Sequence, residues 1–589
     1  MIQDHDNVKR CVVLIRFRSN RCSGICFHAK IIGIVGFVIT KTFPGDNATI
    51  VVGFQHIEAV IVDLSLDKEV HAYQGRDHKH QCQEGCDEPT VEVDRLVHDD
   101  GGTAFGTVHR HIFLRVTSIS ATVLDLDVLG ADSIFLSGYN SWTDSVERHP
   151  LARMRGLRGV PTAIVNRWVL DNSGDYRFVE QAGLPGGQHG VGYGYLRFGN
   201  QVLLVGSLDE DSGFTVVRES ARVSALKLEK EPPERVVHAG EELELCSFAV
   251  CEGALDEAFG RYAGLAGIAC RPAPALVGYS SWYRHYGDIS EDKLLHDLDA
   301  TAALFDGREL GKCRTLFQVD DGYAKVGDWL SPDPGRFPNG MAGIARRAAE
   351  LGFVPGIWLA PFLVEKESRV AAEHPEWLLR DKTGELVAAG GNWSGAWALD
   401  TRVPEVREHI RDFMGVVTRE WGYRFLKLDF LFGACLEPHD GMNRGQLMAD
   451  ALDLLRESVP EGTWFDLCGV PMASALGRTE FCRVGCDVGL DWDDVPYMRL
   501  LHRERVSTKR SLANTRGRAH LDGVAFRCDP DVFFLRRDVR LTDEQRMDLL
   551  TADATLGGMF LTSDDASLWD VTQQKDFDDA LALFVARNG

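Results

Sequence analysis

Several features that mark other protein classes are missing from this 589-residue sequence. It opens without a basic, apolar signal segment, and the longest apolar run near its start, residues 31–39, is interrupted by glycines and too short to cross a bilayer. Its 14 cysteines are scattered, which argues against a framework of closely spaced disulfides. We therefore expect a cytoplasmic protein with reduced thiols.

Positive charge is also scarce, with 64 basic against 87 acidic side chains and a formal net charge of −23. A surface of this sign repels phosphate backbones and anionic lipids, so nucleic acid and membranes are poor candidate partners. A neutral ligand suits the chain better, and self-association into a homo-oligomer stays open.

One stretch near the N-terminus has the side chains of a zinc site, namely His78, His80, Cys82 and Cys86. The spacing matches no common structural zinc module, and the cluster occurs only once. We interpret it as a polar surface loop and expect no bound metal.

The first 255 residues consist of short runs rich in Val, Ile, Phe and Thr, separated by turn residues. Helical periodicity is rare in this part, so residues 1–255 are predicted to form a large antiparallel β-sandwich. Runs of this kind are Thr49–Phe54, Ile112–Val116, Tyr195–Phe198, Gln201–Gly206 and Glu242–Val250.

Residues 256–589 instead alternate short apolar strands with amphipathic helices, the pattern of repeated βα units. The predicted strands are Leu276–Trp282, Thr315–Asp320, Phe353–Leu359, Phe425–Asp429, Thr463–Cys468, Cys482–Asp487, Val524–Cys528 and Gly558–Thr562. No Gly-rich phosphate loop is present, which argues against an open doubly wound sheet. We expect a (β/α)8 TIM barrel.

Polar residues gather where these strands end, which is where barrel enzymes hold their active sites. They are Asp320, Asp321, Lys427, Asp429, Cys468, Arg483 and Asp487. Taken singly, each is more often a turn, a helix cap or a structural ion pair. Together they predict a ring of carboxylates with two cations.

Such a ring could cleave a glycosidic bond, which in retaining enzymes needs two carboxyl groups about 5 Å apart. Asp429 and Asp487 are the natural pair, and Lys427 could lower the pKa of Asp429 and donate to a sugar hydroxyl. Pairing with Arg483 would hold Asp487 ionised, so we expect Arg483 to bind substrate or the nucleophile instead.

The remaining site candidates are suited to binding a sugar. Asp320 and Asp321 could accept hydrogen bonds from neighbouring hydroxyls. Trp329 and Trp358 could supply apolar walls for the C–H face of the ring.

Read in order, these segments resemble family 36 of the glycoside hydrolases, the α-galactosidase family, and more remotely family 27 of the same clan. The resemblance covers about Ser280 to Asp565. It rests on Phe317–Tyr323 (FQVDDGY), Gly327–Trp329 (GDW), Phe337–Gly340 (FPNG), Gly356–Pro361 (GIWLAP), His374–Trp377 (HPEW), Leu426–Asp429 (LKLD), Cys468–Pro471 (CGVP) and Cys482–Val488 (CRVGCDV).

The resemblance implies an N-terminal β-supersandwich, Asp429 as nucleophile and Asp487 as proton donor. It also implies substrate-binding roles for Asp320, Asp321, Trp329, Lys427 and Arg483. The chain departs from the family in reading Leu428 where many members have Trp, and in the form of its acid/base segment. It also leaves too little length after the eighth strand for the family's usual C-terminal β-domain, which we expect to be absent or truncated.

The leading hypothesis is therefore hydrolysis of terminal α-galactosides by double displacement, with no cofactor because two carboxyls supply the chemistry. The same machinery could act on α-glucosides or α-N-acetylgalactosaminides, or transfer galactose as raffinose and stachyose synthases do. A non-catalytic carbohydrate-binding protein is a further alternative, which the presence of both carboxyls disfavours.

Overall fold

The computed structural model describes residues 8–16, 39–40, 47–54, 57–65, 115–123 and 126–589, the last range without residues 155, 158, 172, 181, 182, 184, 222, 223, 235–241 and 494–502. The stretch with His78, His80, Cys82 and Cys86 lies outside them. Within these ranges, no helix is long and apolar enough to span a bilayer.

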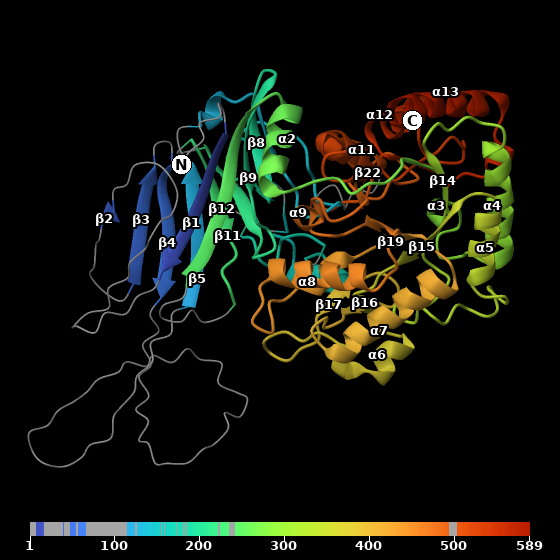
Figure 1. Ribbon diagram of the computed structural model, residues 1–589, viewed down its shortest axis with the longest axis horizontal. Coiled ribbons are helices and arrows are strands. Elements are labelled where there is room, and N and C mark those ends of the chain that lie inside the picture. The colour runs from blue at the N-terminus through green and yellow to red at the C-terminus, as the bar shows by residue number, and fades with distance from the viewer. Residues whose placement is uncertain are drawn as a thin grey trace, which may run out of the picture.

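The N-terminal part folds into two antiparallel sheets, which lie at the left of Figure 1. In spatial order the smaller sheet contains β1 (Val8–Arg16), β12 (Glu242–Gly253), β9 (Gln201–Ser207), β8 (Tyr193–Phe198) and β6 (Ser133–Leu136). The larger contains β2 (Ile39–Thr40), β3 (Asn47–Phe54), β4 (Ile57–Ser65), β5 (Arg115–Val123), β11 (Ala225–Lys230), β10 (Thr215–Ser220) and β7 (His189–Val191). Alternating apolar and polar side chains give a strand one face for the core and one for solvent. In β11, Leu226 and Leu228 are buried while Lys227 between them is partly exposed.

The second part is a parallel sheet curled into a barrel, whose strands lie close to the predicted ones. They are β13 (Leu276–Ser280), β14 (Arg314–Val319), β15 (Val354–Leu359), β19 (Phe425–Leu428), β20 (Trp464–Leu467), β21 (Phe481–Arg483), β22 (Arg527–Asp529), β23 (Val532–Phe533) and β24 (Met559–Thr562). All residues of β13, β15 and β24 are buried, as expected for parallel strands covered on both faces.

The barrel closes through a seventh strand that is split in two. Its first half, β22, pairs with β21, and its second half, β23, pairs with β24. Asp531 lies between the halves with φ 86°, a left-handed conformation that turns the chain. The amide of Gly558 donates to the carbonyl of Cys528 over 2.8 Å, which joins the seventh and eighth strands directly.

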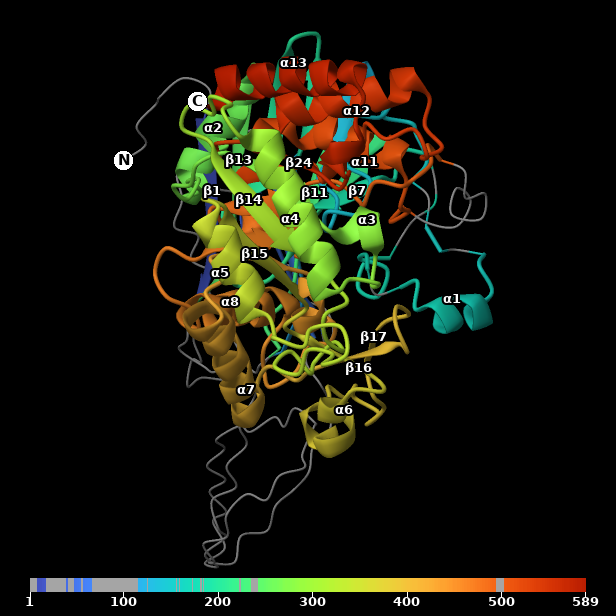
Figure 2. The same ribbon diagram turned by 90° about the vertical axis from the view of Figure 1, so that its right-hand side faces the viewer.

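Helices surround the barrel on its outside (Figures 1 and 2). The longer ones are α4 (Glu291–Phe305), α5 (Ala342–Glu350), α7 (Pro404–Gly415), α8 (Arg444–Glu457), α11 (Thr508–Arg518), α12 (Asp543–Leu556) and α13 (Val571–Asn588). The predicted capping box at the start of α12 is confirmed, because Thr542 and Gln545 each bond the other's backbone amide.

A helix between the two parts packs on the sandwich. The last sandwich strand ends at Gly253 and the first barrel strand begins at Leu276. Between them lies α2 (Leu255–Ala266), whose Tyr262 hydroxyl donates to the carbonyl of Ser207 on β9 over 2.7 Å. The domain boundary after residue 255 stays a prediction.

A buried arginine on the barrel joins it to a loop of the sandwich. Arg518 at the end of α11 donates to the carbonyls of Asn140 (2.7 Å), Ser141 (3.0 Å) and Gly138 (3.3 Å), and to that of Val484 after β21 (2.7 Å). Burial lowers the pKa of Arg518 to about 10. The loop is thereby held against the strand that precedes Asp487.

We predict that Arg518→Met lowers the free energy of unfolding by about 3 kcal/mol or more, because four buried carbonyls each lose the hydrogen bond that Arg518 donates. Urea unfolding would measure the change. Arg516→Met on the same helix is the control, since Arg516 is half exposed and pairs only with surface Asp548. Equal losses in the two variants would contradict the role given to Arg518.

Candidate active site

A buried ion pair links the second and fourth strands at the ends predicted to carry the site. Lys427 on β19 donates to Asp320, directly after β14, over 2.9 Å. Burial by itself lowers the pKa of Lys427, but the attraction of Asp320 outweighs it and the pKa is raised. Gln318 also donates to Asp320, over 2.7 Å, so the carboxylate is fixed in place.

Asp429 follows β19 directly and is held by two N–H donors. The indole of Trp358 on β15 donates to one carboxylate oxygen over 3.1 Å, and the amide of Phe430 donates to the other over 2.7 Å. Phe430 has φ 52°, so the chain turns sharply after Asp429. The carboxylate is oriented from both sides, and 8% of the residue is exposed.

Asp487 lies in the loop after β21, which ends earlier than predicted, at Arg483. Its side chain is 37% exposed, against 3% for Arg483 beneath it. Although this side chain is partly exposed, the surrounding protein limits its solvation and raises the pKa of Asp487; Arg483 and Lys427 oppose that rise, and Asp429 and Asp320 add to it.

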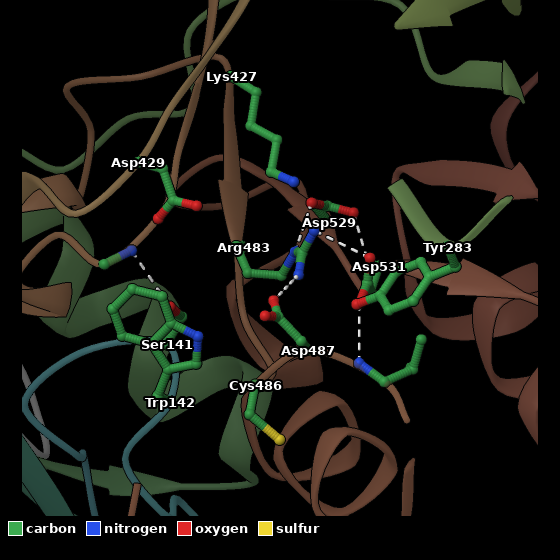
Figure 3. A network of polar contacts seen from close by, with 12 residues as sticks. Ser141, Trp142, Tyr283, Lys427, Asp429, Arg483, Cys486, Asp487, Asp529 and Asp531 are labelled. Atoms are coloured by element: carbon green, nitrogen blue, oxygen red, sulfur yellow. Dashed lines mark hydrogen bonds and ion pairs between the residues drawn. The ribbon is translucent and has the colours of Figure 1, made fainter. Parts of the chain in front are cut away.

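Arg483 is shared among three carboxylates, as Figure 3 shows. It bonds Asp529 over 2.7 Å, Asp531 over 2.9 Å and Asp487 over 3.1 Å. The expectation that Arg483 would avoid Asp487 is therefore wrong. The physical reason is that one guanidinium cannot fully neutralise three carboxylates, so pairing with Arg483 does not hold Asp487 ionised.

The excess of negative charge also shows at Asp531, which lies deeper than Asp487. Burial raises the pKa of Asp531 to about 7; Arg483 opposes this and Asp487 adds to it. Asp531 also accepts hydrogen bonds from Tyr283 and from the amide of Val488 (2.8 Å). Asp531 therefore fixes the backbone next to Asp487.

The other predicted site residues lie at the same end of the barrel. Asp321 accepts from the indole of Trp393 over 2.7 Å, and burial together with Asp320 raises its pKa to about 6. Trp329 is buried behind Trp358, with ring centroids 5.8 Å apart. Cys468 follows β20, and burial and the nearby Asp429 raise its pKa.

Known proteins resemble this chain in both sequence and fold. A family model described as Melibiase matches residues 270–434. An α-galactosidase from Thermus thermophilus, solved in complex with p-nitrophenyl α-D-galactopyranoside, is 27% identical with a TM-score of 0.65, covering 91% of this chain and 95% of that one. The chain is thus similar to α-galactosidases in the sequence of residues 270–434 and in its fold.

Two further α-galactosidases are similar to the chain over different shares of its length. Alpha-galactosidase C of Emericella nidulans is 26% identical over 227 residues, 33% of this chain. The chain spans 27% of the length of that relative. The family 36 enzyme AgaA of Geobacillus stearothermophilus is 13% identical with a TM-score of 0.54, covering 98% of this chain and 76% of that one, and shares the fold.

Two aromatic residues at this candidate site were missed by the sequence analysis. Trp393, in the turn between β17 (Ala388–Gly390) and β18 (Ala396–Ala398), packs 5.4 Å from the ring of Phe430. Its setting among glycines, Gly390-Gly391-Asn392-Trp393-Ser394-Gly395, was an available signal for a tight turn.

The second is Trp142, which comes from the sandwich and reaches the barrel next to Asp429 (Figure 3). Its ring lies 5.4 Å from that of Phe430, and the adjacent Ser141 hydroxyl accepts from the amide of Gly469 over 3.3 Å. Gly469 has φ 62°, and a β-carbon there would be 2.6 Å from the Trp142 ring. No local pattern marks Trp142, because its contacts lie far along the chain.

We predict that Lys427→Met lowers the free energy of unfolding by about 3–5 kcal/mol, because Asp320 is left as a buried, uncompensated charge. Adding Asp320→Asn to Lys427→Met should restore part of the lost stability. Urea unfolding of the wild type, the two single variants and the double variant would measure this. Lys575→Met is the control, since that side chain forms an exposed pair with Asp579. The prediction fails if the two lysine variants unfold alike.

Proposed function

We propose that this protein acts as an α-galactosidase, a retaining glycoside hydrolase that removes terminal α-galactosyl groups. The observation that carries the proposal is the contrast between Asp429 and Asp487. Asp429 is oriented by two N–H donors, whereas the pKa of Asp487 is raised by its enclosed setting. One carboxyl is thus ready to attack, and the other to hold a proton.

In the first step an Asp429 oxygen forms a bond to the anomeric carbon while the bond to the leaving oxygen breaks. Asp487 gives its proton to that oxygen, and the product is a glycosyl-Asp429 ester. In the second step Asp487 takes a proton from water, which attacks the same carbon and releases Asp429. Two inversions leave the sugar with its original configuration.

The deeper residues would select the sugar. Asp320 and Asp321 can accept from neighbouring hydroxyls while Lys427 donates, and Trp358 and Trp393 supply indole surface beside them. The galactoside is the proposed substrate because structures of the Thermus thermophilus relative hold p-nitrophenyl α-D-galactopyranoside and stachyose. Cys468 would line the inner end of the sugar pocket, and Arg483 would offset the negative charge there. Trp329 would pack against Trp358 and hold its ring in place.

We predict that Asp429→Asn lowers kcat on p-nitrophenyl α-galactoside by about 10⁴-fold or more, because the amide is a poor nucleophile. Absorbance follows the release, and NMR of the wild type should show the α-anomer first. Asp578→Asn, a change at an exposed ion pair on α13, should leave the rate unchanged. Near-normal turnover by Asp429→Asn would refute the nucleophile, and faster release from the α-glucoside would refute the sugar.

The pH dependence offers a second prediction. Because Asp487 must be protonated to act as the acid, kcat/KM should fall as pH rises through its raised pKa. Asp531→Asn removes a negative charge and leaves more of Arg483 for Asp487, so the pKa of Asp487 falls and the basic limb moves to lower pH. The amide oxygen can still accept from Tyr283 and Val488. Asp578→Asn again serves as control. If the basic limb of the pH profile in Asp531→Asn stays in place or moves to higher pH, the assignment of Asp487 as the acid is contradicted.

A further inference from the structure

A short helix of the N-terminal part stands away from the core. In α1 (Thr162–Trp168) no side chain is buried, and two apolar ones on the same face are exposed, Ile164 by 40% and Trp168 by 59%. A helix of this length is marginal without packing, yet these two apolar side chains stay largely in contact with solvent. The guanidinium of Arg167 lies 5.7 Å from the centre of the Trp168 ring. Figure 2 shows α1 reaching beside β17, far from the centre of the sandwich.

The segment that carries α1 contacts three loops at the C-terminal end of the barrel. The carbonyl of Trp168 lies 3.2 Å from where a β-carbon of Gly391 would be, in the loop after β15. Arg177 lies 3.6 Å from Glu437, in the loop after β19, and the Tyr176 hydroxyl accepts from the amide of Arg503, in the loop after β21, over 3.0 Å. Since barrel active sites open among these loops, the segment forms part of the rim.

One tight turn connects Trp168 with the pocket itself. Gly391 contacts the backbone of Trp168, and Trp393, two residues further, donates to Asp321 over 2.7 Å. Two residues of extended chain reach at most about 7 Å, so the backbone of Trp168 lies beside the turn that carries Trp393 to Asp321. Asn392 in the turn is exposed and can bond hydroxyl groups.

We propose that Trp168 forms an outer subsite, where its exposed indole face packs against a sugar ring of the leaving group of a neutral α-galactosyl oligosaccharide. The inference rests on the proposed function, and extends it from the galactosyl group to the part of the substrate that departs. An aromatic face offers apolar contact to ring C–H groups at low entropic cost, while Asn392 supplies a hydroxyl partner.

The test compares a long with a short ligand. In an Asp429→Asn background, calorimetry would measure binding of stachyose and of galactose with Trp168 intact, changed to Ala, or changed to Phe. We expect Trp168→Ala to weaken stachyose about threefold to tenfold and galactose not at all, as loss of one aromatic contact implies. Trp168→Phe should keep most of the affinity. Leu129→Ala, which removes another apolar side chain with 56% exposure, is the matched control.

The same variants with Asp429 restored should lose kcat/KM on stachyose by a similar factor and keep it on p-nitrophenyl α-galactoside. Equal losses on both substrates, or no loss on stachyose, would overturn the outer subsite. A lower mass of Trp168→Ala in light scattering would also overturn it, because α1 would then bind a second copy of the chain. Trp168-dependent binding of stachyose without hydrolysis by the wild type would instead overturn the proposed hydrolase alone.

Discussion

The balance of charge around Arg483 is the constraint on which the rest of the site depends. A single buried guanidinium faces Asp487, Asp529 and Asp531, which come from the sixth and seventh strands and the loops that follow them. Removing it would leave three carboxylates without a cation in a poorly solvated place. Arg483 offsets the repulsion among the three carboxylates. Because its single positive charge cannot neutralise all three, Asp487 is still able to hold a proton. Stability and the proposed acid catalysis therefore depend on the same side chain.

The split seventh strand follows from the same constraint. Asp529 and Asp531 both reach Arg483, while β22 and β23 pair with different neighbours and Asp531 takes a left-handed backbone conformation between them. Asp531 also accepts from the amide of Val488, next to Asp487. Barrel closure and the position of the proposed acid are thus fixed by one turn. The backbone cost of that turn is offset by buried hydrogen bonds to a charged group.

The N-terminal sandwich contributes two segments to the candidate site on the barrel. The loop with Ser141 and Trp142 is held by carbonyl bonds to Arg518, and it places an indole beside the chain that carries Asp429. The segment with Arg177 and α1 reaches the barrel loops on the same face. Because loops can vary while the strands stay fixed, these two segments are where substrate preference would change without loss of the barrel.

The sequence by itself determined most of the barrel strands and the polar residues that follow the second and fourth, because apolar periodicity and the position of a polar residue after a strand are local properties. It did not predict that the sixth strand ends at Arg483 or that the seventh is split in two. Asp320, Lys427 and Asp429 stand where the pattern put them. Only the tertiary structure decided the pairing of Arg483 with Asp487, and brought Trp142 and Trp393 to the site. Those outcomes depend on how several carboxylates share one cation and on contacts between segments far apart in the chain, which no local pattern encodes.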